Sequence, residues 1–174
     1  MLSGCGGSGP ARAIQLDPAA SAAKALEAYD TNGDGQLSVG ELERTPALAA
    51  SAQRIDRDGD GALSDQEIRA RLEALEAQSD FIALSVLVTS KGRPLVGAVL
   101  TLTPEPFMGD DLQSFSGTTV EGGACPLLSD RAPVPGIPVG FYQAKIVHAG
   151  ASIDEIRGCE IADDVTGNRL RFDL

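Results

Sequence analysis

The chain is poor in the residues that carry most catalytic, nucleic-acid-binding and membrane-spanning chemistry. Its 174 residues include no tryptophan, one histidine and two methionines, and aromatic residues make up 4%. Any core must therefore consist of Leu, Val, Ile and Ala. The hydrophobic content of 43% is enough for one ordinary domain or two small ones. No apolar run is long enough to span a bilayer.

Positive charge is also scarce. The net charge of −11 argues against nucleic acid or an anionic membrane surface as an electrostatic partner. Residues 30–67 carry nine acidic and three basic residues, a net charge of −6. More than half of the acidity therefore lies in one short stretch, where bound cations would neutralise it.

The shortage of histidine and cysteine limits the catalytic options. His148 is the single histidine, and the three cysteines have no CxxC spacing, which argues against structural zinc. His148 follows Tyr142, Ala144 and Ile146 on one face of an expected strand, so a buried or hydrogen-bonded histidine is favoured over a catalytic base. No G-x-S-x-G elbow occurs. We therefore predict no catalytic residue and no enzyme; a hydrolase with an unrecognised Ser-His-Asp or carboxylate pair stays as an alternative.

The acidic stretch contains two similar twelve-residue segments, 30–41 and 56–67. Both have oxygen-bearing side chains at positions 1, 3, 5, 9 and 12, glycine at position 6 and leucine at position 8. This spacing is that of the calcium loop of an EF-hand, in which position 7 offers its backbone carbonyl and position 12 a bidentate carboxylate. The predicted ligands of two calcium ions are Asp30, Asn32, Asp34, Gln36, Ser38, Glu41, Asp56, Asp58, Asp60, Ala62, Ser64 and Glu67.

Helices are expected around both loops. Asp17-Pro18 is a typical helix start before a helix over 19–29, and a short helix after Glu41 must stop near Thr45 because a proline follows. A helix over 47–55 enters the second loop. The exit helix from Glu67 to about Ser79 should bury Ile68, Leu72 and Leu75 and expose Arg69, Arg71, Glu73 and Glu76. Because only fourteen residues separate the loops and both methionines lie elsewhere, we expect a structural calcium site rather than a sensor.

From Ile82 onward the apolar period changes to two. Strands are predicted at residues 82–88, 95–103, 114–120, 124–128, 139–148, 157–162 and 168–174. Seven short strands with frequent turns favour an antiparallel β-sandwich. The predicted fold is α+β with two domains: a tether over 1–16, an EF-hand pair over 17–79 and a sandwich over 80–174.

The run Lys91-Gly-Arg-Pro-Leu-Val-Gly-Ala98, the turn at 117–123 and the strand at 136–142 resemble the carboxypeptidase regulatory-like, transthyretin-like sandwich. The resemblance covers nearly all of residues 81–174 and implies a regulatory or accessory role. The hydroxyisourate hydrolases of this fold need several histidines, and this chain has one. Together with the loops and the N-terminus, the arrangement resembles bacterial cell-envelope lipoproteins.

The N-terminal Leu2-Ser3-Gly4-Cys5, followed by a Gly-Ser tether, resembles the lipobox of those lipoproteins. Lipid on Cys5 would place the protein outside the cytoplasm, in the cell envelope or on the outer surface, with the membrane reached only through the anchor. Cys125 and Cys159 would then be a candidate disulfide in an oxidising compartment; two buried free thiols are the alternative. A mass unchanged by reductant would exclude the bond.

The leading prediction is a non-enzymatic, calcium-binding envelope protein whose partner is an unknown protein or envelope component. A dockerin-like partner module, using the loops for calcium-dependent adhesion, is the second hypothesis. The helix at 19–29 argues against it, since dockerin loops have no entering helix. The segment 104–116, with Phe107, Met108 and Phe115, is either an exposed apolar patch or a loop folded over the sheet end.

Overall fold

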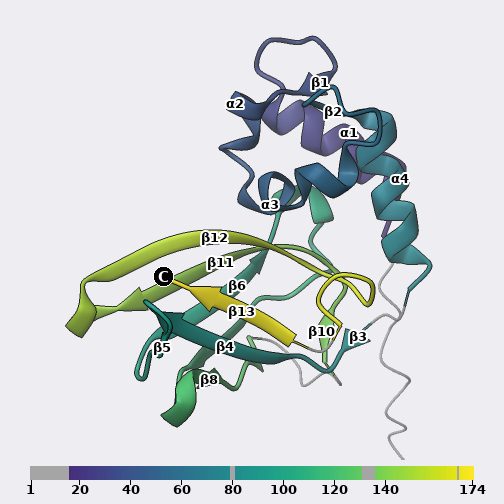
Figure 1. Cartoon of the computed structure of the whole chain (residues 1–174). Coiled ribbons are helices and arrows are strands. Elements are labelled where there is room, and N and C mark those ends of the chain that lie inside the picture. Colours follow the sequence, from purple (N-terminus) through teal and green to yellow (C-terminus); the bar gives the residue numbers. More distant parts are fainter. Residues whose placement is uncertain (1–15, 79–80, 131–135, 168) are drawn as a thin grey trace, which may run out of the picture.

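The computed structural model describes residues 16–78, 81–130, 136–167 and 169–174. Residues 16–78 form a helical module and residues 81–174 a β domain, and Figure 1 shows the helices gathered on one side of the sheets. Within these residues no helix is both long and apolar enough to cross a membrane. The α+β class predicted from the sequence is confirmed.

The helical module has four helices and two very short strands. These are α1 (Pro18–Tyr29), β1 (Gln36–Leu37), α2 (Val39–Leu42), α3 (Pro46–Ile55), β2 (Leu63–Ser64) and α4 (Asp65–Glu76). The predicted start of α1 is confirmed: Asp17 accepts a hydrogen bond from the Ala20 N–H at 2.9 Å, and Pro18 occupies the first helical position. α2 is a single turn because Pro46 follows so closely, as expected.

The β domain contains two main sheets. Its strands are β3 (Phe81–Ile82), β4 (Ser85–Ser90), β5 (Arg93–Pro94), β6 (Val99–Pro104), β7 (Phe115–Thr118), β8 (Ala124–Cys125), β9 (Leu128–Ser129), β10 (Ile137–Pro138), β11 (Gly140–His148), β12 (Ile153–Ile161) and β13 (Arg169–Asp173). Three 3-10 turns lie between them: η1 (Pro106–Met108), η2 (Glu121–Gly123) and η3 (Ala149–Ala151).

The sheet order is β12-β11-β6-β7-β9 in the larger sheet and β13-β4-β5 in the smaller, where β8 also pairs with β4. β13 runs parallel to β4, so the prediction of a purely antiparallel arrangement is wrong. The predicted strand at 82–88 is divided, since β3 pairs with β10 while β4 joins the smaller sheet. The predicted strand at 157–162 begins earlier, at Ile153.

The two sheets share one hydrophobic core. Alternate residues of β4, Val86 and Val88, are buried, as are Leu100 and Leu102 of β6. Phe107 of η1 packs on Phe141 of β11 with ring centroids 5.9 Å apart. The segment 104–116 thus folds over the sheet end, with Phe107, Met108 and Phe115 buried, and it forms no exposed apolar patch.

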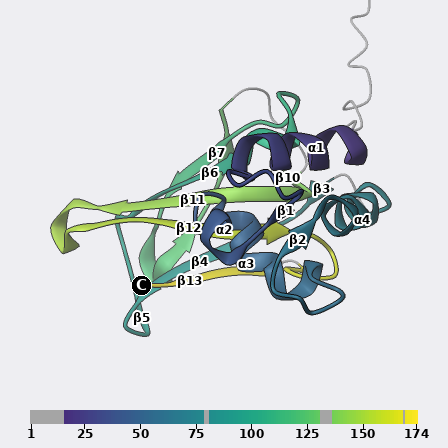
Figure 2. The same cartoon turned by 90° about the horizontal axis from the view of Figure 1, so that it is seen from above.

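The helical module packs on the outer face of the larger sheet, away from the smaller one (Figures 1 and 2). α3 lies against β12 and β11, and α1 lies against η1. Buried residues of the module, among them Leu48 and Leu72, belong to the same hydrophobic cluster as the core between the sheets. The two parts therefore form one packed body.

A fully buried carboxylate, Glu105, lies between the module and the β domain. It follows β6 and accepts hydrogen bonds from the Tyr29 hydroxyl (3.4 Å), the Thr45 hydroxyl (3.2 Å), the Ala47 N–H (3.1 Å) and the Gln143 amide (3.0 Å). Burial, together with the Glu105 charge, raises the pKa of Tyr29 to about 12. Glu105 is therefore satisfied mainly by groups of the helical module.

A second buried carboxylate, Glu160 on β12, is 3% exposed and pairs with Arg54 of α3 and Arg71 of α4. Arg71 also binds Asp164 through two N–H groups at 2.8 Å, a geometry that suits a guanidinium. The prediction that Arg71 faces outward is wrong, because the side chain is turned toward the β domain and the residue is buried. Gln78 adds a hydrogen bond to Asp164 at 3.0 Å.

Backbone approaches backbone where α3 meets β12. A Cβ atom built on Gly158 would lie 1.7 Å from the Pro46 carbonyl oxygen and 2.4 Å from the Ala47 nitrogen. Gly158 is opposite Gln143 in the β11–β12 ladder, so the close approach lies beside the Glu105 network. Any side chain at this position would push the helix off the sheet.

The two cysteines of the β domain are separate. Cys125 is on β8 of the smaller sheet and Cys159 on β12 of the larger one, and both are buried free thiols. The predicted disulfide is therefore not formed in this structure, and the alternative of two buried thiols describes it. Burial raises the pKa of Cys159 to about 12 and raises that of Cys125 as well, so neither is a reactive thiolate.

Replacing Ile146 with Ala tests the shared core. Ile146 of β11 is fully buried, and its truncation should lower the free energy of unfolding by about 2–5 kcal/mol. Urea unfolding followed by circular dichroism measures this change. Ile156→Ala is the matched control, because Ile156 on the neighbouring strand is 53% exposed and should change stability by less than about 0.5 kcal/mol. Equal losses for the two variants would contradict this core.

Acid should weaken the contact between Arg71 and Asp164. The Arg71 hydrogen bonds lower the pKa of Asp164 from its ordinary 3.8 to about 2. This stabilisation is complete above the ordinary pKa and is lost as the pH falls through about 2. We expect the parent chain to lose more stability than Asp164→Asn between about pH 6 and pH 3. Urea unfolding measures the difference, with Asp111→Asn as control; identical pH profiles for parent and Asp164→Asn would refute it.

Candidate metal centre

Each of two helices leads directly into an acidic loop. α1 ends where the Asp30 N–H donates to the Leu26 carbonyl at 2.8 Å, and α3 ends where the Asp56 N–H donates to Ala52 at 2.8 Å. The chain then turns away from the helix axis, because Asp30 and Asp56 have extended ψ angles. The two aspartates at position 1 thus stand at equivalent places at the ends of equivalent helices.

The aspartates at position 1 fold both loops through backbone N–H groups. Asp30 accepts from Gly33 at 2.7 Å and from Gly35 at 2.9 Å. Asp56 accepts from Gly59 at 2.7 Å and from Gly61 at 3.0 Å. Gly35 and Gly61 have φ of +84° and +86°, a conformation that other residues rarely adopt, which explains the glycine at position 6.

Positions 3 and 5 continue this arrangement. Asn32 accepts from the Asp34 N–H at 2.8 Å, and Asp34 accepts from the Gln36 N–H at 2.9 Å. In the second loop Asp58 accepts from the Asp60 N–H at 3.1 Å, and Asp60 accepts from Ala62 at 2.8 Å. Each of these oxygen side chains is thus held by the backbone N–H of the residue two positions further along the loop.

The glutamates at position 12 close the loops. Glu41 Oε1 accepts from the Thr31 N–H at 2.8 Å, and its Oε2 accepts from the Ser38 N–H and hydroxyl at 2.9 and 2.7 Å. Glu67 has the equivalent contacts with Arg57 N–H (2.8 Å) and with Ser64 N–H and hydroxyl (3.0 and 2.8 Å). Each glutamate therefore joins the start of its loop to the first turn of the exit helix.

These contacts favour the charged glutamates. The Ser38 hydroxyl, followed by the N–H groups of Ser38 and Thr31, lowers the pKa of Glu41 to about 2. Burial of Glu67 opposes ionisation, but the N–H groups of Ser64 and Arg57 outweigh it and lower its pKa. Both carboxylates are thus anionic at neutral pH, as metal ligands must be.

A short antiparallel contact joins the loops. β1 and β2 pair Gln36 with Ser64 and Leu37 with Leu63, and both leucines are buried. The leucine at position 8 of each loop supplies the apolar part of this contact. The two loops are therefore held side by side in one unit.

The donor set fits calcium. Every predicted side-chain ligand offers oxygen, and hard oxygen donors from carboxylates, amides and carbonyls are what calcium prefers. In the second loop, single carboxylate oxygens of Asp56, Asp58 and Asp60 lie within 4.8 Å of one another, a spacing that one ion can bridge. The first loop has Asn32 at position 3, and its amide donates to Asp34 at 2.9 Å.

Comparison with known proteins agrees with this geometry. A family model described as EF hand matches residues 23–44 and 53–72. The helical module contains an EF-hand pair. Calcium binding is the property that this pair supports, and the predicted ligand residues all lie within the matched segments. None of the matched residues lies in the β domain.

The remaining comparisons are weaker. No curated protein matches the chain. Among solved structures, the Bacillus anthracis TIE protein is 21% identical, with 55% of this chain and 16% of that chain covered and a TM-score of 0.38. An (S)-allantoin synthase is 16% identical, with 88% of this chain and 65% of that chain covered and a TM-score of 0.36. The chain spans less than two thirds of either, and such TM-scores do not establish a common fold.

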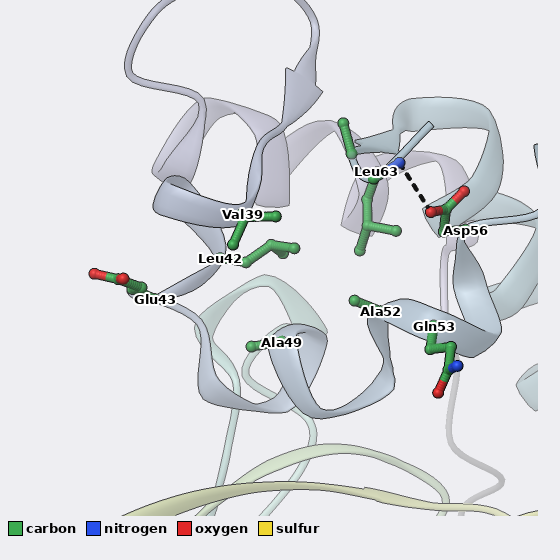
Figure 3. A pocket seen from close by; sticks show the side chains of 10 residues that line it. Val39, Leu42, Glu43, Ala49, Ala52, Gln53, Asp56 and Leu63 are labelled. Atoms are coloured by element: carbon green, nitrogen blue, oxygen red, sulfur yellow. Dashed lines mark hydrogen bonds between the residues drawn. The ribbon is translucent and has the colours of Figure 1, made fainter. Parts of the chain in front are cut away.

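An apolar pocket of about 430 Å³ lies between α2, α3 and the second loop (Figure 3). Val39, Leu42, Ala49 and Leu63 face it, and Val39 is 70% exposed. Its polar lining residues are Glu43, Gln53 and Asp56. The Asp56 carboxylate is turned back to the loop backbone (Figure 3), so the pocket presents mainly an aliphatic surface.

His148 and α1 bear on the two alternatives considered in the sequence analysis, a hydrolase and a dockerin-like module. The Nδ1 of His148 accepts from the Ala151 N–H at 2.8 Å, and Nε2 lies 2.9 Å from the Val96 carbonyl. The histidine therefore caps the turn η3, as the hydrogen-bonded interpretation proposed. α1 is formed, which counts against a dockerin-like use of the first loop. Cys5 lies outside the described residues.

Sequence reasoning missed Glu105 and Glu160, which contact the helices that carry the loops. Glu105 lies between Pro104 and Pro106, outside the predicted strands, and it had no distinguishing signal because acids are spread over the whole β domain. For Glu160 one signal was available. It occupies a strand between Cys159 and Ile161, and an acid among apolar residues in a strand is expected to be paired when buried.

Replacing Ser64 with Ala tests the closure of the second loop. Ser64 is the N-cap of α4, and its hydroxyl holds Glu67. Without calcium, we expect the variant to lose about 0.5–2 kcal/mol of stability, measured by urea unfolding. Ser85→Ala on β4 serves as control, since Ser85 is exposed. A Ser64→Ala chain as stable as its control would show that the hydroxyl does not close the loop.

Proposed function

We propose that the chain is a non-enzymatic, calcium-binding protein in which two calcium ions order the EF-hand pair. The observation that carries this proposal is the repeated hydrogen-bonding pattern of the loops, in which backbone N–H groups hold oxygen ligands at equivalent positions. Calcium would relieve the repulsion among the carboxylates crowded into each loop. The apo pair should therefore be less ordered than the loaded pair.

The packing supports a structural rather than a signalling role. In sensors, calcium opens a helix pair and exposes a methionine-rich groove. Here α3 packs on β12 and β11, and its inward residues Ala47 and Leu48 are fully buried. An apolar helix face already covered by the same chain supports constitutive calcium binding.

Titration calorimetry on Glu41→Gln and Glu67→Gln tests the proposal. Each substitution removes the position-12 carboxylate of one loop, and each should abolish or strongly weaken one of two binding events. The second loop should bind more tightly, since it offers four carboxylates against three, so Glu67→Gln should remove the tighter event.

Glu121→Gln is the control for the loss of one negative charge. Glu121 is exposed in the turn η2 of the β domain, and its replacement should leave both events in place. Isotherms unchanged in both loop variants would end the calcium hypothesis.

Export and lipid attachment through Cys5 stay predictions from the sequence. Outside the cytoplasm calcium is abundant, which agrees with permanent occupancy of the loops. The resemblance of the β domain to carboxypeptidase regulatory-like domains likewise stays a prediction from the sequence. Membrane fractionation of a Cys5→Ser chain tests the anchor: this chain should leave the membrane fraction, and retention there would refute the lipid.

A further inference from the structure

We propose that Glu105 and Glu160 of the β domain are positioning residues for the calcium loops. They hold the helices that carry the loops, so that attachment of the helical module to the β domain raises its affinity for calcium. Calcium in turn strengthens the attachment. This inference rests on the calcium binding proposed above and adds the β domain to the binding machinery.

The first support is the origin of the hydrogen bonds. Three of the four contacts to Glu105 come from the helical module, and so do both arginines that pair with Glu160. A buried carboxylate is costly unless it is fully hydrogen-bonded or paired. Both sites are therefore satisfied only when the helices lie in one particular position on the sheet.

The second support is where these partners lie along the chain. Tyr29 directly precedes the first ligand of the first loop, Asp30, and Arg54 lies two residues before Asp56. Arg71 lies one helical turn after the last ligand, Glu67. Three of the helices that flank the loops thus carry a residue of the buried network close to a ligand.

The third support is that the contact between α3 and β12 leaves no room for movement. At Gly158 there is no space for even a Cβ atom beneath the Pro46 carbonyl. A small rotation of α3 would therefore break van der Waals contact or cause a clash, and it would also move Arg54 and Ala47 off their carboxylates. The contact is satisfied in one arrangement and lost in others, as a two-state element requires.

These three features couple calcium binding to the attachment of the helical module to the β domain. When calcium closes the loops, it fixes the directions in which α1, α3 and α4 leave them, and the buried network is satisfied in one set of directions. Because binding free energies are reciprocal, an interface that favours the closed loops must raise calcium affinity by the factor by which calcium favours the interface. Such factors are typically about 5- to 150-fold.

Arg71→Gln provides a decisive test, because the proposal and simple electrostatics predict changes in calcium affinity in opposite directions. Loss of a positive charge near Glu67 would by itself tighten calcium binding through simple electrostatics. Loss of the Glu160 and Asp164 contacts should weaken it, by about fivefold or more. Arg69→Gln is the matched control. It removes the same charge from α4, but Arg69 is exposed and, within the part of the chain that the structure describes, its ion pair is with Glu73 on the same helix.

Gly158→Ala and Thr45→Val test the same proposal without changing charge. The first forces α3 away from β12, and the second removes a hydroxyl from Glu105. Both should weaken calcium binding measured by titration calorimetry on the full chain. Ile156→Ala, on the same strand as Gly158, is the control that should leave the affinity unchanged.

Tyrosine fluorescence measures the attachment of the helical module to the β domain separately from calcium binding. In a Tyr142→Phe background Tyr29 is the remaining tyrosine and the chain has no tryptophan, so tyrosine emission reports the contact between Tyr29 and Glu105. Emission should change in Gly158→Ala, while circular dichroism verifies that the β domain is folded. The expected result is a calcium affinity that is weakened in the three interface variants, unchanged in Ile156→Ala, and unchanged or slightly tightened in Arg69→Gln, where only the charge is lost.

Two outcomes would overturn the proposal. One is tighter binding in Arg71→Gln, as electrostatics alone predicts. The other is a parental affinity in Gly158→Ala, whether or not the Tyr29 emission has changed. Absence of calcium binding in the parent chain would instead refute the proposed function itself, so the two failures are distinguishable.

Discussion

A carboxylate removed from water must find its hydrogen bonds and counter-charges inside the protein, and this constraint determines how the two parts of the chain fit together. Glu105 and Glu160 lie on the β domain, yet the groups that satisfy them come mainly from the helices above. Apolar contacts bring α3 to the sheet, but apolar contacts alone tolerate sliding. The buried acids select one position, a role for which buried polar groups are suited.

The same constraint operates on a smaller scale within the loops. Asp30 and Asp56 each accept two backbone N–H groups, and Glu41 and Glu67 span from the beginning of the loop to the exit helix. The Ser38 hydroxyl and the backbone donors that organise these oxygens also lower the pKa of Glu41, and backbone N–H groups together with the Ser64 hydroxyl lower that of Glu67. The hydrogen bonds of the chain therefore supply part of the order of each loop, and a bound cation would add to it.

The EF-hand loops could be recognised from the sequence because the predicted ligands of each loop, and the side-chain hydrogen bonds that hold them, lie within twelve consecutive residues. Helix α1 was predictable from its cap for the same local reason. Arg71 was assigned to solvent because polarity and helical period were the only guides, whereas its partner Glu160 lies 89 residues further on. The parallel pairing of β13 with β4 and the placement of Cys125 and Cys159 in different sheets likewise depend on contacts between distant segments, which a local pattern does not contain.

The continuous cluster of buried apolar side chains has a consequence for dividing the protein. It extends from Leu48 and Leu72 of the helical module to the space between the sheets. A cut between residues 78 and 81, where the composition changes most clearly, would uncover one apolar surface on each fragment together with two unmatched acids. The sequence pattern divides the chain into two parts, but in the structure the two parts share one buried apolar cluster.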